Sequence, residues 1–216
     1  MRASTRWTVA AFVVVVALVV ALVAQLNDDG PTPGTPGGQD IARDRRDADT
    51  PEALAGPRAR ADLPACPAPG VGDGPAALRG ITLECAGDGT PVDVGRALAG
   101  RAVVLNLWAY WCGPCAEELP AMAEYQRRVG PDVTVVTVHQ DENETAALLR
   151  LAELGVRLPT LQDGRRLIAA ALRVPNVMPA TVVLRADGSV ADILPRSFAT
   201  ADEIAAAVNP QLGVSG

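Results

Sequence analysis

Two cysteines separated by only two residues constrain this chain more than any other feature. Cys112 and Cys115 follow the apolar run 102–108, which is typical of a buried strand, and the residues after Cys115 have the pattern of a helix. A C-x-x-C at a strand-to-helix junction indicates a dithiol or disulfide redox site. The first sulfur then lies at a helix N-terminus, where unpaired backbone N–H groups and the helix dipole favour a thiolate. The second sulfur follows about one turn later, close enough to close a small ring.

The residues on both sides of the two cysteines narrow this interpretation. Residues 106–115, followed by Glu-Glu-Leu-Pro at 117–120, resemble the active-site segment of thioredoxin-like proteins. Within those proteins they are most similar to the membrane-anchored, extracytoplasmic reductases of the TlpA/ResA group. A zinc half-site or a structural pair is the alternative for a bare C-x-x-C, but zinc needs four ligands and the chain has only His139 besides its four cysteines. We therefore expect no metal and no cofactor.

The remaining segments predict an α/β fold. The resemblance implies a thioredoxin-like fold, in which helices flank a central mixed β-sheet, here with an N-terminal β-hairpin extension at residues 81–94. An Asp-Gly pair marks the turn of that hairpin. Further strands are predicted at 102–108, 132–138, 181–184 and 190–194, helices from Gly113 onward and at 141–154, 165–172 and 200–208, and a connector at 157–163.

Cys66 and Cys85 remain once the C-x-x-C is paired. Four cysteines permit three connectivities, and the adjacency of the other two favours a bridge between Cys66 and Cys85. Such a pair indicates an oxidising compartment. We interpret it as a structural disulfide, because nothing around either residue is typical of a helix N-terminus that lowers a thiol pKa. A second redox relay is the alternative.

The N-terminal part has the composition of an anchor and a tether. Residues 7–26 carry no charge, which is about the length that crosses a bilayer, and Arg2 and Arg6 precede them. We expect a single-pass membrane anchor at 1–26, a disordered Pro/Gly/Asp-rich tether at 27–62 and an extracytoplasmic thioredoxin-like domain at 63–216. A cleaved signal peptide is the alternative to the anchor, and it leads to the same compartment.

The resemblance implies further residues at the site. Trp111, Gly113 and Pro114 would support the two cysteines, with Trp111 and Trp108 shielding the thiolate. Pro179 matches the position of a cis-proline that faces the cysteines in thioredoxin-like folds. A cis bond there exposes the Met178 backbone for strand-like pairing with a substrate peptide, and it keeps metal ions from the dithiol. An ordinary trans-proline at the start of a strand is the alternative.

Asn106 departs from the thioredoxin pattern, and the roles of Glu117, Glu118 and His139 are open. Thioredoxins carry a buried acid six residues before the first cysteine, and here that position is Asn106, which cannot act as a base. Glu117 and Glu118 could serve through water, but we expect both to be solvated residues of the first helical turn. His139 follows the end of a strand, and we expect a surface or capping role for it.

The resemblance implies a protein disulfide reductase that receives electrons from a transmembrane thiol carrier, with cytochrome c maturation among its candidate processes. We expect a monomer. The net charge of −6, without a basic cluster interleaved with aromatic residues, argues against nucleic-acid binding. The alternatives are a peroxiredoxin-like peroxidase, whose cysteine normally lies alone in a Thr/Ser-rich, Arg-supported setting, and a copper-binding dithiol module without enzymatic activity.

Overall fold

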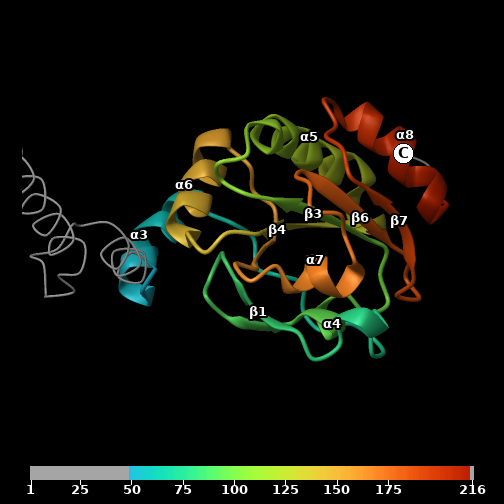
Figure 1. Ribbon diagram of the computed structural model, residues 1–216, viewed down its shortest axis with the longest axis horizontal. Coiled ribbons are helices and arrows are strands. Elements are labelled where there is room, and N and C mark those ends of the chain that lie inside the picture. The colour runs from blue at the N-terminus through green and yellow to red at the C-terminus, as the bar shows by residue number, and fades with distance from the viewer. Residues whose placement is uncertain (1–48, 215–216) are drawn as a thin grey trace, which may run out of the picture. The chain divides into compact units, whose positions relative to one another are not determined.

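The described strands form one mixed sheet in the order β2-β1-β5-β4-β3-β6-β7 (Figure 1). The structure is a computed structural model, and it describes residues 49–214. Strand β3 pairs parallel with β4 and antiparallel with β6, while β5 pairs parallel with β4 and antiparallel with β1. The strands are β1 Thr82–Cys85, β2 Pro91–Asp93, β3 Val103–Trp108, β4 Thr134–His139, β5 Thr160–Gln162, β6 Ala180–Leu184 and β7 Val190–Leu194.

Helices cover both faces of this sheet. One apolar cluster joins the sheet to α5, α6 and α8, and a second joins it to α4, α7 and a short 3-10 turn, so the sheet lies between two cores (Figure 1). The helices are α3 Pro51–Ala61, α4 Val94–Ala97, α5 Gly113–Val129, α6 Glu144–Leu154, α7 Leu167–Leu172 and α8 Ala201–Leu212, with 3-10 turns η1 Ala76–Leu78 and η2 Gly130–Asp132. The α/β class and the mixed central sheet predicted from the sequence are confirmed.

Strand β3 lies inside the sheet, and its C-terminal end leads into the segment that carries Cys112. All six of its residues are buried, as expected for a central strand that packs helices on both faces. Alternate side chains divide between the two cores: Val104 and Trp108 face α5 and α8, and Leu105 and Leu107 face α7. The chain leaves β3 at Trp108 and enters α5 five residues later, so the strand and the helix fix the position of the dithiol between them.

The segment predicted as a connector at 157–163 contains strand β5, and that prediction was wrong there. Thr160–Gln162 continues the sheet from β4 to β1. Three residues are too few to show an alternation of apolar and polar side chains, so the sequence gives no signal for this strand.

Helix α3 occupies residues 51–61, where the sequence analysis predicted the end of a disordered tether, so that prediction was wrong over its last part. Thr50 caps the helix by accepting the Ala53 N–H at 3.3 Å. Leu54 and Ala61 lie seven residues apart on one face, and both are buried, with Leu148 of α6 in the same small cluster. Few apolar residues suffice here because they fall on a single face.

Arg58 holds α3 to the rest of the domain. Its guanidinium pairs with Glu84 of β1 and with Glu144 at the start of α6, the latter at 3.0 Å, and its Nε donates to the Ala86 carbonyl. Burial raises the pKa of Glu144 to about 7, although its hydrogen bond with Arg58 acts in the opposite direction. Asp49, just before α3, accepts the backbone N–H of Thr145 at 3.0 Å. Charged contacts therefore fix α3 on α6 together with the small apolar cluster.

Replacing Arg58 with methionine is expected to destabilise the domain by about 3 kcal/mol at pH 8, because Glu84 and the buried Glu144 lose their shared cation. The loss will be smaller at pH 5.5, where Glu144 takes up a proton. Urea unfolding at both pH values measures this. Arg60→Met is the matched control, since Arg60 is exposed on the same helix. Equal unfolding midpoints for the two variants would contradict the role given to Arg58.

The predicted membrane anchor at 1–26 and most of the predicted tether lie outside the described residues. Within 49–214, no helix combines the length and the hydropathy that a bilayer crossing requires.

Candidate active site

Cys112 is the N-cap residue of α5, as predicted, and it forms a disulfide with Cys115. Its Sγ accepts the backbone N–H of Cys115 at 3.3 Å. Gly113 and Pro114 fill the first two positions of the helix, where a proline costs no hydrogen bond and its fixed φ suits the turn. The sulfur therefore sits where unpaired N–H groups converge, and negative charge on it is stabilised.

The two sulfurs differ in their access to solvent. Cys112 is 6% exposed, whereas Cys115 is fully buried beneath the helix. Trp111 beside them is 57% exposed, and its indole N–H donates to Asp141 at 3.0 Å, so the ring is held at the rim of the site. An incoming thiol or disulfide can therefore reach Cys112 but not Cys115. Cys115 can still attack Cys112 from inside the protein.

The Met178–Pro179 peptide bond is cis, as the resemblance implies. Met178 is partly buried and packs against the same apolar cluster that contains Cys112 and Cys115. Pro179 immediately precedes β6, the antiparallel neighbour of β3. The structure therefore brings together the five residues predicted around the cysteine pair at the C-terminal end of β3: Trp111, Gly113, Pro114, Met178 and Pro179.

Glu118 is not solvated, and the expectation that it would be was wrong. The side chain is fully buried, and its two carboxylate oxygens accept the Asn106 amide at 2.8 Å and the Phe198 backbone N–H at 3.2 Å. Burial raises the pKa of Glu118 to about 7, against these two hydrogen bonds and the charge of Arg196, which lower it. Glu117 is exposed, as expected.

A buried carboxyl near neutrality is suited to proton transfer. Glu118 follows Cys115 by three residues on α5, so both side chains lie on the helix face that packs on the sheet. Asn106 occupies the strand position at which thioredoxins carry a buried acid. In this chain the Asn106 side-chain amide donates a hydrogen bond to the Glu118 carboxylate. The i, i+3 spacing of Glu118 from Cys115 was the signal in the sequence that Glu118 could be buried beside the cysteine.

His139 is also buried, so the surface role expected for it was wrong. Its Nε2 accepts the Tyr110 N–H at 3.4 Å, and Nδ1 lies 2.8 Å from Gln162 Oε1, which assigns the ring hydrogen to Nδ1. Burial lowers the pKa of His139, and the ring is therefore neutral. The ring centroids of His139 and Trp108 are 5.0 Å apart. His139 thus positions the loop before Cys112.

Cys66 and Cys85 form the second disulfide, as predicted, with a sequence separation of 19. Cys85 is fully buried at the end of β1, and the Cys66 N–H donates to its sulfur. The bridge ties the entry segment to strand β1 of the sheet. Within the described part of the chain, no group of three or more His, Cys, Asp or Glu side chains is placed to hold a metal ion.

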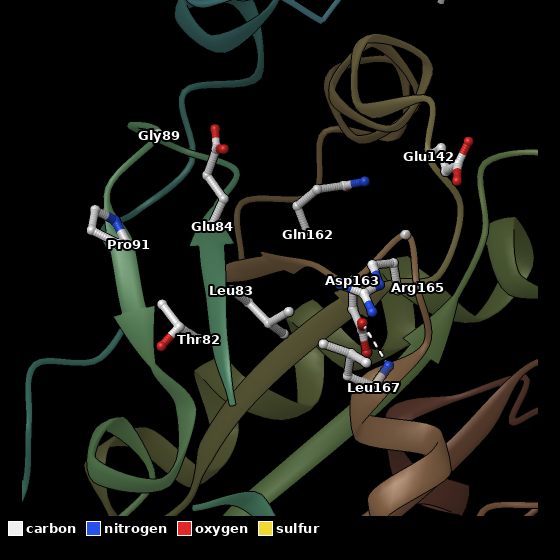
Figure 2. A pocket seen from close by; sticks show the side chains of 11 residues that line it. Thr82, Leu83, Glu84, Gly89, Pro91, Glu142, Gln162, Asp163, Arg165 and Leu167 are labelled. Carbon is white, nitrogen blue, oxygen red and sulfur yellow. Dashed lines mark hydrogen bonds between the residues drawn. The ribbon is translucent and has the colours of Figure 1, made fainter. Parts of the chain in front are cut away.

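A hollow of about 430 Å³ beside strands β2, β1 and β5 is separate from the cysteines (Figure 2). Glu84, Gln162 and Arg165 are among its lining residues, and none of the four cysteines is. Asp163 turns away toward α7, where it accepts the Leu167 N–H at 2.7 Å. This hollow offers no redox group, so the dithiol remains the candidate active site.

A disulfide on the helix that follows the central strand, with a cis-proline beside it, is characteristic of thioredoxin-like redox proteins, and the fold belongs to that class. Comparison with family models is more specific. The model described as Redoxin matches residues 68–207. The chain therefore belongs to the redoxin family.

Curated relatives match less than half of the chain. The thiol-disulfide oxidoreductase ResA of Bacillus subtilis (strain 168) is 32% identical over 98 residues, which are 45% of this chain and 54% of ResA. The chain thus spans about half the length of this relative. Thioredoxin 1 of Synechococcus elongatus is 34% identical over 85 residues, 38% of this chain and 76% of that protein.

Two solved structures extend the likeness to the fold. One is MTB DsbF in mixed oxidised and reduced forms, with 26% identity and a TM-score of 0.56 over 64% of this chain and 98% of that chain. The other is a secreted Mycobacterium tuberculosis disulfide oxidoreductase described as homologous to E. coli DsbE, with 28% identity and a TM-score of 0.52 over 60% and 94%.

Proposed function

We propose that this protein is a thiol–disulfide oxidoreductase that reduces disulfide bonds in other proteins. One observation carries the proposal: a disulfide whose outer sulfur, Cys112, caps helix α5 while its partner, Cys115, is buried beneath it. This arrangement separates an attacking sulfur from a resolving sulfur. The names of the relatives, ResA and disulfide oxidoreductases of the DsbE type, agree with it.

The reaction begins from the reduced pair. The Cys112 thiolate attacks one sulfur of a substrate disulfide, which forms a mixed disulfide and expels the other substrate sulfur as a thiolate. Cys115 then loses its proton to the Glu118 carboxylate and attacks Cys112 Sγ. The mixed disulfide breaks, the second substrate sulfur leaves, and the 112–115 bridge observed here forms. The enzyme is oxidised and the substrate gains two electrons; its two thiolates take up two protons, one released again by Glu118 and one from water.

A donor outside the protein must then reduce the 112–115 bridge. We assign this role to a transmembrane thiol carrier, and we place the domain on the outer side of the cell membrane, tethered through residues 1–26. Two features support this placement: the uncharged stretch at 7–26 and a structural disulfide, which is typical of oxidising compartments. In that setting, cytochrome c maturation is a candidate process. We expect the domain to work as a monomer.

The direction of the reaction is tested by the reduction potential of the 112–115 pair. Equilibration with glutathione or dithiothreitol buffers is expected to give a value near that of thioredoxin, about −270 mV, since Gly-Pro separates the cysteines in both. The reduced protein should also reduce insulin disulfides. A value near −120 mV would instead indicate that the protein oxidises its clients. A protein that exchanges with no disulfide would not be an oxidoreductase at all.

A further inference from the structure

Three arginines surround a hollow on the surface of helix α7. Arg165 and Arg166 precede the helix and Arg173 follows it, and together they line a cavity of about 360 Å³. Its floor is apolar, formed by Ala169, Ala170 and Val174. Arg165 and Arg173 are exposed, and Arg166 is half-buried. The chain as a whole is acidic, with a net charge of −6, so this concentration of guanidinium groups is a local exception.

Within the described residues no carboxylate forms an ion pair with these arginines, although the charges of Arg165 and Arg166 act on Asp163 and favour its carboxylate form. Arg166 donates to the side-chain oxygens of Asn176 at 2.6 Å and Gln140 at 3.0 Å, which are neutral amides. Asp163 lies close by, but it is buried and its carboxylate accepts the N–H groups at the start of α7. In the same described part, several other arginines do pair with acids, for example Arg150 with Glu153. The hollow therefore presents an excess of positive charge to solvent, mainly from the exposed Arg165 and Arg173.

Hydrogen bonds of Arg166 connect the hollow to segments beside the candidate active site. Gln140, one partner of Arg166, donates its backbone N–H to the Trp108 carbonyl at the end of β3. Asn176, its other partner, lies two residues before Met178 in the cis-proline loop. Arg166 thus joins the two segments that flank the dithiol. Val177 is 41% exposed in the same loop, and Trp111 forms the other rim.

We propose that this arginine hollow selects disulfide-bearing polypeptides with acidic residues near the cystine, by binding their carboxylates as they pass the Met178 loop. The inference rests on the proposed function and names the substrate class of the same site. A polypeptide that pairs with the backbone of Met178 would extend directly toward Asn176 and the hollow. Guanidinium groups suit carboxylates because they offer several donors in a planar fork.

The expected effect is moderate, because ion pairs at a surface contribute at most about 1 kcal/mol each. Reversing two charges should change the ratio of kcat/KM for acidic over basic clients about tenfold or more. The preference should also weaken between 25 and 500 mM salt, since exposed charges are screened.

The experiment uses two synthetic peptides with the same cystine loop, one flanked by aspartates and one by arginines. Wild-type protein should reduce the acidic peptide faster, and the double variant Arg165→Glu, Arg173→Glu should lose or invert this preference. The double variant Arg60→Glu, Arg127→Glu, which changes two exposed arginines on α3 and at the far end of α5, matches the net charge and should keep it.

Three outcomes separate this inference from the proposed function. If wild-type protein reduces neither peptide nor the neutral hydroxyethyl disulfide, the proposed function fails. If it reduces both peptides equally at low salt, or if both double variants shift the ratio alike, only the arginine hollow is overturned as a client site. Binding to anionic phosphatidylglycerol vesicles that disappears in Arg165→Glu, Arg173→Glu, without any peptide preference, would assign the surface to the membrane and also overturn the inference.

Discussion

Replacing Cys115 with serine will stop the reaction at a covalent complex between Cys112 and its client. The attack on the client needs only the outer thiolate, which the variant retains, whereas release needs the buried second sulfur. Replacing Cys112 will instead abolish turnover, by on the order of 10³-fold or more, because Cys115 is fully buried and cannot replace it as the attacking group. Intact-mass spectrometry of the variant incubated with an oxidised client measures the trapped adduct.

The control for this prediction is the second disulfide. A variant in which Cys66 and Cys85 are both alanine should retain insulin reduction while losing about 3 kcal/mol of stability, as expected for opening a loop of this length. Adducts that form through Cys66 or Cys85 in the Cys115→Ser protein would show that the redox site has been placed on the wrong pair. Rapid turnover by the Cys112→Ser protein would show the same.

Replacing Glu118 with glutamine will have opposite effects on rate and on stability. Without a carboxylate to accept the Cys115 proton, the resolving step should slow on the order of 10²-fold, and the mixed disulfide should accumulate. The first attack, by Cys112, should change far less. Stopped-flow measurement of single turnovers separates the two steps.

The stability effect follows from the pKa of Glu118, which folding raises from 4.5 to about 7. The folded state then binds the proton more tightly, so this group stabilises the fold at low pH and the contribution is lost as pH rises from 4.5 through 7. The loss amounts to about 3 kcal/mol. The difference in unfolding free energy between wild type and Glu118→Gln should therefore shift by that amount, in favour of the variant, between pH 4.5 and pH 8.

Glu117→Gln is the matched control, because Glu117 is the exposed neighbour on the same turn. It should leave both the resolving rate and the pH profile of stability close to those of the wild type. Parallel stability curves for Glu118→Gln and wild type would show that the buried carboxyl titrates normally. An unchanged resolving rate would remove Glu118 from the mechanism and leave it a structural acid.

The sequence was sufficient to predict the central strand, the helix capped by Cys112 and both disulfide pairings. The strand, the helix and the 112–115 pair are encoded locally, by a continuous apolar run and by cysteine spacing, whereas the 66–85 pair follows because only those two cysteines remain. The position of Pro179 came from the resemblance instead. A proline before a strand has no local signal for its isomer, and the cis bond is visible only in the structure.

Glu118 and His139 could not be predicted correctly because their burial depends on other elements. The helix dipole explains why an acid is favoured in the first turns of α5, but the partners that bury Glu118 are Asn106 on β3 and Phe198 before α8. His139 is covered by the loop that carries Tyr110 and by Gln162 of β5, a strand that itself lacks a sequence pattern.

Helix α3 also depends on residues distant in the sequence, and it could not be predicted for that reason. Its composition is that of a disordered segment, and the helix is held by Arg58 bridging two acids that lie 26 and 86 residues away in sequence. Pairing over such separations leaves no periodic signal in the segment itself. Composition therefore identified the kind of residues present but not the charges that they meet.

The central claim is that Cys112 ionises readily because it caps helix α5. Its most direct test is a titration of the Cys115→Ser protein, in which Cys112 is the single free thiol while the 66–85 bridge is intact. The rate of alkylation by iodoacetamide, followed against pH, should give a pKa for Cys112 well below that of a free cysteine. A pKa equal to or above that of a free cysteine would contradict the account.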